Sequence, residues 1–393
     1  MADNKNNNER NVPHLRFPEF SGEWDSFKLV ELGKFIGGGT PSSSNLSFWT
    51  GSIPWISSSD IKEDNINNIS ISRYITEEAI EKSATKYCPA PVILIVSRVG
   101  VGKVALSHTS LCTSQDFCNI IEIKCHPVFL SYNLLRTMKR KSREVQGTSI
   151  KGITSDELQK MRVFIPKNKD EQNKISNLLT LLDERIATQN KIIEDLKKLK
   201  SAIIDQLYSA IKGKGYSYRQ IFEIVNERNK QLEYSNILSA SQEKGMVNRE
   251  DLNLDIQFER SNINTYKVVR KGDYVIHLRS FQGGYAFSDK IGVCSPAYTI
   301  LRPNDLLEFR FLSYYFTSQK FIKSLIIVTY GIRDGRSINV EEWLDMKTTI
   351  PQKEQQRHIV DTIRNIEKKI ENEELYASYL SKQKQYLLRQ LFI

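Results

Sequence analysis

A helical heptad pattern occurs twice in this chain. Each position of the first copy, from Ile175 to Leu207, has its counterpart 184 residues later, from Ile359 to Leu391. The apolar positions are Ile175, Leu179, Leu182, Ile186, Ile193, Leu196, Ile203 and Leu207, and then Ile359, Ile363, Ile366, Ile370, Leu380, Leu387 and Leu391. Their alternating four- and three-residue spacing keeps one apolar stripe on one side of a helix, as coiled-coil packing requires. Both copies also carry lysine at the eighth seam position, Lys200 and Lys384. Because a polar residue interrupts the apolar stripe at the same position in both copies, we infer a duplicated unit whose two helices pack on each other.

The similarity between the two copies extends beyond the helices. An Ile-Pro pair precedes each helix, at Pro166 and Pro351, and the tetrapeptide Phe-Leu-Ser-Tyr that begins at Phe129 recurs at Phe311. Proline suits a helix start because its missing N–H would be unpaired there anyway. The interval is far longer than the period of a solenoid. The chain is therefore predicted to run globular domain, long helix, globular domain, long helix.

The fold class that we expect is α+β. The apolar run 91–96 predicts a buried strand, 127–145 predicts a helix, 272–279 a strand and 311–326 another helix. Strands and helices alternate without a regular βαβ rhythm, so we expect a mixed or antiparallel sheet in each globular domain. The expected boundaries are a tail 1–20, a first domain 21–166, a first helix 167–212, a second domain 213–351 and a second helix 352–393.

Composition favours an anionic partner. The formal net charge is +10 and the pI is near 9.1, which favours nucleic acid first and an acidic membrane surface second. The sequence has no apolar run long enough to span a bilayer, and its polar N-terminus does not resemble a signal peptide. The five cysteines form no CxxC pair, so the expected compartment is the reducing cytoplasm.

Two segments raise the question of a metal or phosphate site. Cys112, Cys118, Cys125, His108 and His126 lie close in sequence, but their spacing matches no standard zinc knuckle, and buried structural thiols are the expectation. The segment 100–103 ends like a phosphate-binding loop, yet it lacks the upstream glycine and the Ser or Thr after the lysine. We interpret its glycines as a turn between two strands. The sequence also lacks the amino-methylating, metalloprotease and nucleophile-elbow motifs. We therefore expect no catalytic centre and no metal.

Basic side chains provide the candidates for nucleic-acid binding. Five cations, among them Arg136 and Arg143, lie at the end of the 127–145 helix, where they could neutralise phosphates or complement the helix dipole. Arg98 and Arg279 lie beside glycines at matching strand ends. Arginine suits bidentate recognition of guanine, and glycine permits a close approach of the backbone. Their recurrence in both domains favours two readers of two half-sites.

The order of domains and helices resembles the specificity subunit of type I restriction-modification systems. The local matches are the segment 12–20, the Gly-Gly-Thr-Pro-Ser of 38–42 with the Ile-Pro-Trp-Ile of 53–56, and the segment 147–153. The resemblance covers nearly the whole chain, and the duplicated architecture is its most specific element. The corresponding glycines of the second domain, 283–284 and 331–336, are looser matches.

The resemblance implies a non-catalytic, DNA-reading scaffold. Each globular domain would be a target-recognition domain for one half of a split duplex target, and the long helices would pack as an antiparallel coiled coil with a pseudo-two-fold internal repeat. The residues expected to contact DNA are Thr40, Arg98, Lys103, Arg136, Lys139, Arg140, Lys141, Lys151, Arg279, Gln282, Arg333 and Arg336. Two modification subunits carrying S-adenosylmethionine, and motor-nuclease subunits using ATP and Mg²⁺, would be the partners, with no membrane involved.

Two alternatives stay open. The chain could be an autonomous nucleic-acid-modifying enzyme with an unrecognised active site, in which case it would transfer methyl groups to DNA without a partner. It could also be a coiled-coil interaction protein whose basic surface is incidental, in which case no duplex sequence would be preferred.

Overall fold

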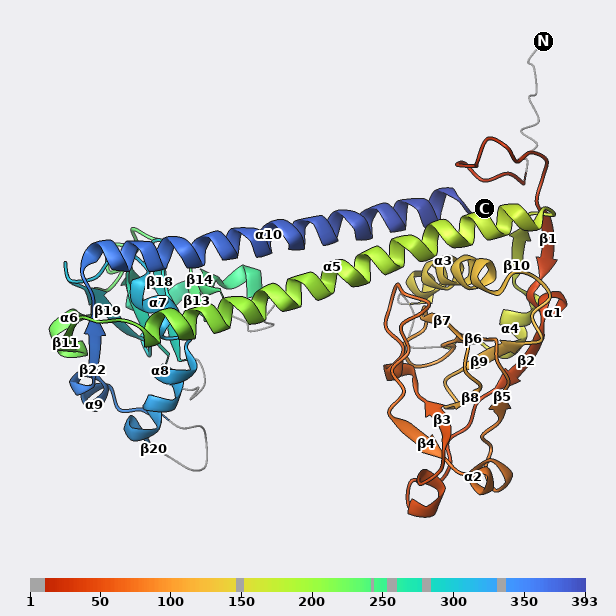
Figure 1. Ribbon diagram of the computed structural model, residues 1–393, viewed down its shortest axis with the longest axis horizontal. Coiled ribbons are helices and arrows are strands. Elements are labelled where there is room, and N and C mark those ends of the chain that lie inside the picture. The colour runs from red at the N-terminus through yellow and green to blue at the C-terminus, as the bar shows by residue number, and fades with distance from the viewer. Residues whose placement is uncertain (1–10, 146–151, 242–243, 253–259, 278–283, 331–336) are drawn as a thin grey trace, which may run out of the picture. The chain divides into compact units, whose positions relative to one another are not determined.

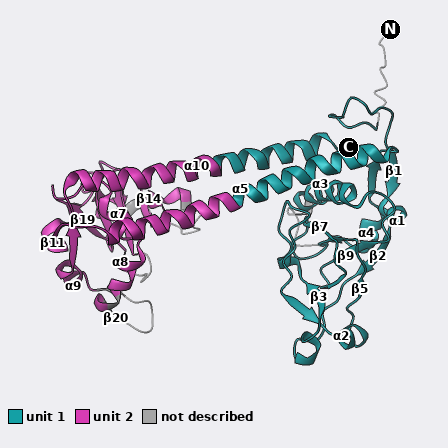
Figure 2. Cartoon of the chain, in the orientation of Figure 1, with its two compact units in different colours: residues 1–190, 375–393 teal, residues 191–374 magenta. Residues whose placement is uncertain are grey.

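The computed structural model describes residues 11–145, 152–241, 244–252, 260–277, 284–330 and 337–393. The chain divides into two compact units. Unit 1 comprises Met1–Asn190 and Leu375–Ile393, and unit 2 comprises Lys191–Glu374 (Figure 2). Each unit therefore takes in one globular part and a portion of both long helices. The predicted boundaries between domains and helices stay a prediction.

Unit 1 is built around a four-stranded antiparallel sheet of order β2-β9-β6-β7. Its strands are β2 (Lys34–Gly37), β6 (Val92–Ile95), β7 (Val104–Ser107) and β9 (Cys118–Ile121). Every residue of β6 is buried, because alternate side chains face two different layers. Ile93 and Ile95 pack in the cluster beneath a helix, while Val92 and Leu94 pack in a second cluster against another sheet.

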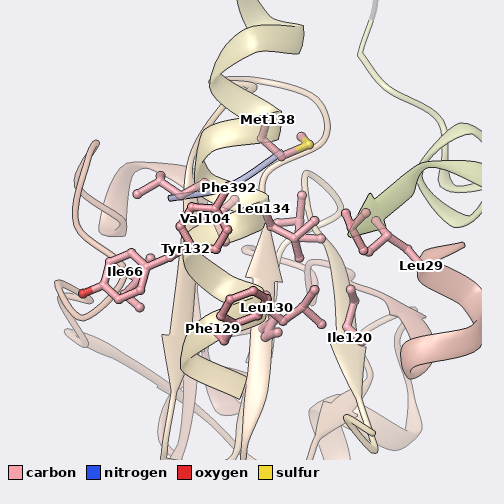
Figure 3. Packing of buried hydrophobic residues seen from close by; sticks show 14 of the residues in the cluster. Leu29, Ile66, Val104, Ile120, Phe129, Leu130, Tyr132, Leu134, Met138 and Phe392 are labelled. Atoms are coloured by element: carbon pink, nitrogen blue, oxygen red, sulfur yellow. The ribbon is translucent and has the colours of Figure 1, made fainter. Parts of the chain in front are cut away.

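The layers on either side of this sheet are a helix and a smaller sheet. Helix α3 (Pro127–Val145) contributes Phe129, Leu130 and Leu134 to the first cluster, together with Phe392 (Figure 3). The smaller sheet has the order β4-β3-β8-β5. Its strands are β3 (Ile53–Ile56), β4 (Arg73–Ile75), β5 (Tyr87–Cys88) and β8 (Leu111–Thr113). The remaining elements are β1 (Asp25–Lys28), β10 (Arg162–Ile165), α1 (Leu29–Leu32), α2 (Glu77–Glu81), α4 (Ser155–Lys160), η1 (Leu46–Trp49) and η2 (Ser58–Asp60).

Unit 2 repeats the order of the main sheet. Its strands run β12-β19-β16-β17, and β11 pairs antiparallel with β22 as β1 pairs with β10. These strands are β11 (Lys214–Ser217), β12 (Phe222–Val225), β16 (Tyr274–Ile276), β17 (Tyr285–Phe287), β19 (Thr299–Pro303) and β22 (Lys347–Ile350). Two units that share strand order and pairing confirm the prediction of a duplicated α+β chain.

The other described elements of unit 2 are short. They are β13 (Leu238–Ser241), β14 (Gly245–Asn248), β15 (Lys267–Val269), β18 (Gly292–Cys294), β20 (Thr329–Tyr330), β21 (Ser337–Ile338), α6 (Tyr218–Ile221), α7 (Phe311–Tyr315), α8 (Gln319–Ser324), α9 (Val340–Asp345), η3 (Arg249–Leu252), η4 (Arg260–Thr265) and η5 (Leu325–Val328). The prediction of one helix over 311–326 was wrong. The helix breaks before Ser318, whose side chain accepts a hydrogen bond from the Phe321 N–H and starts α8 as a new helix.

Two long helices complete the chain, α5 (Lys169–Ser209) and α10 (Lys353–Gln390) (Figure 1). They pack on each other within each unit. In unit 1, Asp183 of α5 forms an ion pair with Lys384 of α10. In unit 2, Lys200 of α5 lies 3.4 Å from the carboxylate of Glu367, and Lys197 lies 2.7 Å from that of Glu374. In both units a later residue of α5 pairs with an earlier residue of α10. The paired segments of the two helices therefore run antiparallel.

A buried glutamine fixes the start of each long helix. Gln172 accepts a hydrogen bond from the His126 N–H at 3.0 Å and donates to the Pro166 carbonyl at 2.9 Å. Gln356 accepts from the Glu308 N–H at 2.8 Å and donates to the Pro351 carbonyl at 3.0 Å. Each glutamine thus ties the Ile-Pro segment to the chain before α3 or α7, which explains why a glutamine follows the proline in both copies.

Among the described residues, no helix is both long enough and apolar enough to cross a membrane.

Candidate nucleic-acid interface

Four loops of unit 1 meet at one side of the molecule, and we refer to residues 38–44, 57–60, 97–103 and 114–116 together as the loop edge. The Gly39 N–H donates to the Thr113 carbonyl at 2.8 Å, and its own carbonyl accepts from Trp55 Nε1 at 2.9 Å and from Thr85 Oγ1 at 2.6 Å. A Cβ on Gly38 would lie 2.0 Å from the Ser114 carbonyl oxygen. Gly38 is therefore required where the first loop packs against the fourth, and Gly39 is required where the first loop packs against the backbone of Ala84 and Thr85.

The side chains at this junction are polar and exposed. The hydroxyl of Thr40 donates a hydrogen bond to the Gln115 side-chain carbonyl, and both residues are exposed. The neighbouring Asp116 carbonyl accepts from the Ser97 N–H at 2.8 Å, and Ser97 in turn accepts from the Ile153 N–H at 2.7 Å. Ser97 is buried whereas Arg98 beside it is exposed. The fold thus brings Thr40, Gln115 and Arg98 onto adjoining loops.

The turn between β6 and β7 carries Lys103. Gly100 and Gly102 adopt positive φ values of 87° and 112°, which the predicted strand-to-strand turn uses. Lys103 Nζ donates to the Ser58 carbonyl at 3.1 Å, and the lysine stays half-buried. Its ammonium group therefore holds the turn 97–103 against the loop 57–60.

The loop 57–60 is anchored by a local charge network. Asp60 accepts from the Ser57 N–H at 2.7 Å and forms an ion pair with Arg73. The Arg73 guanidinium also lies 4.6 Å from the centre of the Trp55 ring.

Two of the cations at the end of α3 are engaged inside unit 1. Arg136 Nη1 donates to the Ile393 carbonyl, and burial, together with nearby Arg140, lowers the Arg136 pKa. Lys139 forms an ion pair with Asp64 at 2.6 Å. Arg140 is exposed and Lys141 is half-buried. The basic side chains on α3 that were predicted to contact DNA are therefore not equivalent. Arg136 and Lys139 bind groups within unit 1, whereas Arg140 is exposed to solvent.

The predicted readers Lys151, Arg279, Gln282, Arg333 and Arg336 lie outside the described residues. Two of them fall between β16 and β17, which pair antiparallel like β6 and β7. The described end of that hairpin closes with a hydrogen bond from the His277 N–H to the Gly284 carbonyl at 2.9 Å. The strands that precede and follow Arg98 in unit 1 and Arg279 in unit 2 therefore pair in the same antiparallel way.

Two residues were not predicted from the sequence, Gln115 on the loop edge and Arg73, which binds the loop edge at Asp60. Gln115 lies in a polar tripeptide, Ser-Gln-Asp at 114–116, between the buried strands β8 and β9, and that interruption was a usable signal. Arg73 had no such signal, because its partner Asp60 lies across a strand pairing. Glutamine and arginine are side chains that can form paired hydrogen bonds to adenine and guanine edges.

The predicted seam residues are all buried or half-buried, and all lie in α5 or α10 except Leu391, which follows the last residue of α10. The buried ones are Ile175, Leu179, Leu182, Ile193, Ile359, Ile363, Ile370, Leu380 and Leu391, and the half-buried ones are Ile186, Leu196, Ile203, Leu207, Ile366 and Leu387. The lysine at the eighth seam position meets an acid of the other helix in both units, Lys384 with Asp183 and Lys200 with Glu367.

The same acids bind the tyrosines of the repeated Phe-Leu-Ser-Tyr segments. The Tyr132 hydroxyl donates to Asp183 at 2.8 Å, and the Tyr314 hydroxyl donates to Glu367 at 2.6 Å. Each unit therefore contains one tyrosine–acid–lysine triad that joins its globular part to both long helices.

The five cysteines are free thiols, and most of them are buried. Cys88, Cys112, Cys118 and Cys294 are buried and Cys125 is half-buried, and burial raises the pKa of Cys88 to about 11 and that of Cys112 to about 12. Within the part of the chain that the structure describes, no group of three or more His, Cys, Asp or Glu side chains is placed to hold a metal ion.

Comparison with known proteins gives one consistent result. The family model described as "Type I restriction modification DNA specificity domain" matches residues 21–198 and again 214–377. The chain is 34% identical over 186 residues to the type I restriction enzyme MjaIX specificity subunit of Methanocaldococcus jannaschii, covering 45% of this chain and 42% of that protein. It is 34% identical over 192 residues to the EcoR124I/EcoR124II specificity subunit of Escherichia coli, covering 47% and 46%. Less than half the length of either relative is matched.

Solved structures share the fold. A chain from a structure concerned with complex assembly and conformational transition of the type I R-M system has a TM-score of 0.62 at 15% identity, covering 94% of this chain and 97% of that one. The type I restriction-modification S subunit from M. genitalium has a TM-score of 0.52 at 16% identity, covering 97% and 99%. At these identities the likeness concerns the fold alone.

Proposed function

We propose, from the premise that this chain belongs to the type I restriction modification DNA specificity family, that it reads a split duplex DNA target with its two globular domains. The observation that carries the proposal is the repeated sheet order with exposed polar side chains on the loop edge of unit 1. Thr40, Gln115 and Arg98 offer hydrogen-bonding groups to base edges and phosphates. The equivalent strand connections of unit 2 would present the second reader.

The long helices would act as an antiparallel coiled coil that sets the spacing between the two half-sites. A helix of 41 residues such as α5 is roughly 60 Å long at ~1.5 Å per residue. One turn of duplex DNA is about 34 Å, so a helix of this length suits half-sites about one turn apart. The buried ion pair in unit 1 and its counterpart in unit 2 support a defined register.

Catalysis would belong to partner subunits. Two modification subunits carrying S-adenosylmethionine would dock on the pseudo-two-fold framework, and motor-nuclease subunits would use ATP and Mg²⁺. The chain itself would be non-catalytic and would work on cytoplasmic DNA. Family membership and the names of the two relatives support this division of labour.

The test is a selection of duplexes by the full-length protein from a random-sequence pool. The expected result is an enriched motif of two short blocks separated by a gap of constant length. Enrichment of one uninterrupted block, or of no sequence, would refute a two-part reader. Methyl transfer from S-adenosylmethionine to DNA by the purified chain alone would instead support an autonomous enzyme.

Two substitutions, Gln115→Ala and Arg98→Ala, test whether the loop edge recognises one of the two half-sites. Gln115→Ala should lower discrimination at one half-site by about 1–3 kcal/mol and leave the salt dependence of binding unchanged, since a glutamine carries no charge. Arg98→Ala should weaken binding and, if the guanidinium contacts a phosphate, reduce the magnitude of the salt slope by about 1.

Arg162→Ala is the matched control, because Arg162 is also exposed in unit 1 but lies on β10 outside the loop edge. Titrations with the selected duplex and with variants of each half-site measure the effects. A loss that is equal at both half-sites for Gln115→Ala would exclude the loop edge as a reader of one half.

A further inference from the structure

A hairpin in unit 1 reaches from the loop edge to helices α3 and α10, and we name residues 61–69 the strap hairpin. Its stem is held by a bridge between Ile61 and Ile69, and the Ser70 N–H donates to the Asp60 carbonyl at 2.8 Å. The stem therefore begins directly at the anchored loop 57–60, which carries Asp60 with its partners Ser57 and Arg73.

The tip of the strap hairpin contacts both α3 and α10. Asp64 has a left-handed backbone conformation with a φ of 61°, and its carbonyl oxygen accepts a hydrogen bond from Lys384 Nζ of α10. The Asp64 carboxylate binds Lys139 of α3 at 2.6 Å. The side chains of Lys384 and its other partner Asp183 are each only 4% exposed.

An apolar contact fixes the middle of the hairpin. Ile66 is completely buried in the cluster that contains Tyr132 and Met138 of α3 (Figure 3). Its carbonyl accepts from the Leu106 N–H of β7 at 2.8 Å. The strap hairpin is thus held by the sheet, by α3 and by the buried lysine of α10 at once.

We propose that the strap hairpin positions the loop edge relative to the helices of unit 1, with Asp64 as the positioning residue. A buried lysine needs hydrogen-bond acceptors for its ammonium group, so Lys384 holds the Asp64 carbonyl at a defined place. The stem, paired at Ile61 and Ile69, then transmits that position to the loop 57–60, to which Lys103 of the turn 97–103 is hydrogen-bonded. This inference rests on the proposed function, because its readout is recognition of a half-site.

The backbone of Asp64 allows a sharp test. A β-branched residue is strained in the left-handed conformation, whereas asparagine tolerates it. Asp64→Val should therefore displace the carbonyl from Lys384, while Asp64→Asn keeps the backbone and removes only the exposed ion pair with Lys139. The full-length variants are titrated with the duplex selected by the wild-type protein and with duplexes altered in either half-site.

Asp64→Val is expected to lower discrimination about tenfold at the half-site that responds to Gln115→Ala and to leave the other half-site unchanged. Asp64→Asn should match the wild type. If Asp64→Val does not fold, Asp64→Ala replaces it, since alanine is strained in the same conformation to a lesser degree. Thermal unfolding is recorded for each variant.

Two results would overturn the inference. The first is full discrimination at both half-sites by a folded Asp64→Val or Asp64→Ala protein. The second is an equal loss at both half-sites that follows the fall in melting temperature, as a purely structural role would produce. Failure of the wild-type protein to select any split target would refute the proposed function instead, so the two failures are distinguishable.

Discussion

Single buried polar side chains determine how each globular part meets the long helices. Gln172 is 5% exposed and Gln356 is 1% exposed. Gln172 bonds two backbone groups and Gln356 bonds three, in each case from separate segments. A buried donor or acceptor that loses its partner costs more than the bond itself contributes. These residues are therefore structural in both copies.

Replacing either glutamine with methionine keeps its length and removes its polar atoms. Gln356→Met should lower the free energy of unfolding by about 1–3 kcal/mol, because the Glu308 N–H and the Pro351 carbonyl lose their partner. Gln172→Met should have a similar effect. The adjacent exposed Gln355 is the control, and its replacement with methionine should change stability by less than about 0.5 kcal/mol. Denaturant titration measures all three, and equal effects at positions 355 and 356 would contradict the assignment.

The buried pair of Lys384 and Asp183 is a second case at this scale. Burial lowers the pKa of Lys384 and raises that of Asp183, while the attraction between them opposes both shifts. Removing one partner leaves an uncompensated buried charge. Lys384→Met alone should therefore cost about 3–5 kcal/mol, whereas Lys384→Met with Asp183→Asn should recover most of that loss.

The double variant keeps an acceptor for the Tyr132 hydroxyl because asparagine retains a side-chain carbonyl. Unfolding by urea at pH 7 compares the three proteins. A double variant as unstable as the single one would mean that the lysine acts through something other than its charge.

At the scale of elements, the spacing of apolar residues predicted those helices and strands that depend on residues close together in the sequence. The four-three spacing predicted both long helices, and the apolar run at 91–96 predicted the strand β6. The 311–326 segment was predicted as one helix because apolar periodicity does not register the cap at Ser318. Sheet order and the acids that meet Lys200 and Lys384 could not be predicted, because they depend on pairings between segments far apart in the chain.

The same distinction applies to the candidate interface. The sequence predicted a turn between two strands at 100–103, and the Gly-Gly-Thr-Pro-Ser of 38–42 was a local match to the specificity subunits. That they meet depends on the pairing of β3 with β8 and of β6 with β7, which no local pattern specifies. Gln115 became a candidate only when its bond to Thr40 was seen.

At the scale of the whole molecule, the proposal makes the length of the long helices a determinant of target spacing. Four residues inserted after Ala187 of α5, with four inserted after Tyr379 of α10, lengthen both helices by about 6 Å and preserve the pairing of Asp183 with Lys384. That is close to two base pairs of duplex. The preferred gap should lengthen while the two half-site sequences stay the same, as selection from a random pool would measure. Altered half-sites with an unchanged gap would reject the idea that the helices set the spacing.

The most direct measurement of the central claim is a genome-wide map of methylated adenines in cells with and without this protein. The account predicts methylation within one motif of two blocks and a constant gap, present only in cells that contain the chain. Identical maps in the two cell types, or a protein-dependent motif without a gap, would contradict it.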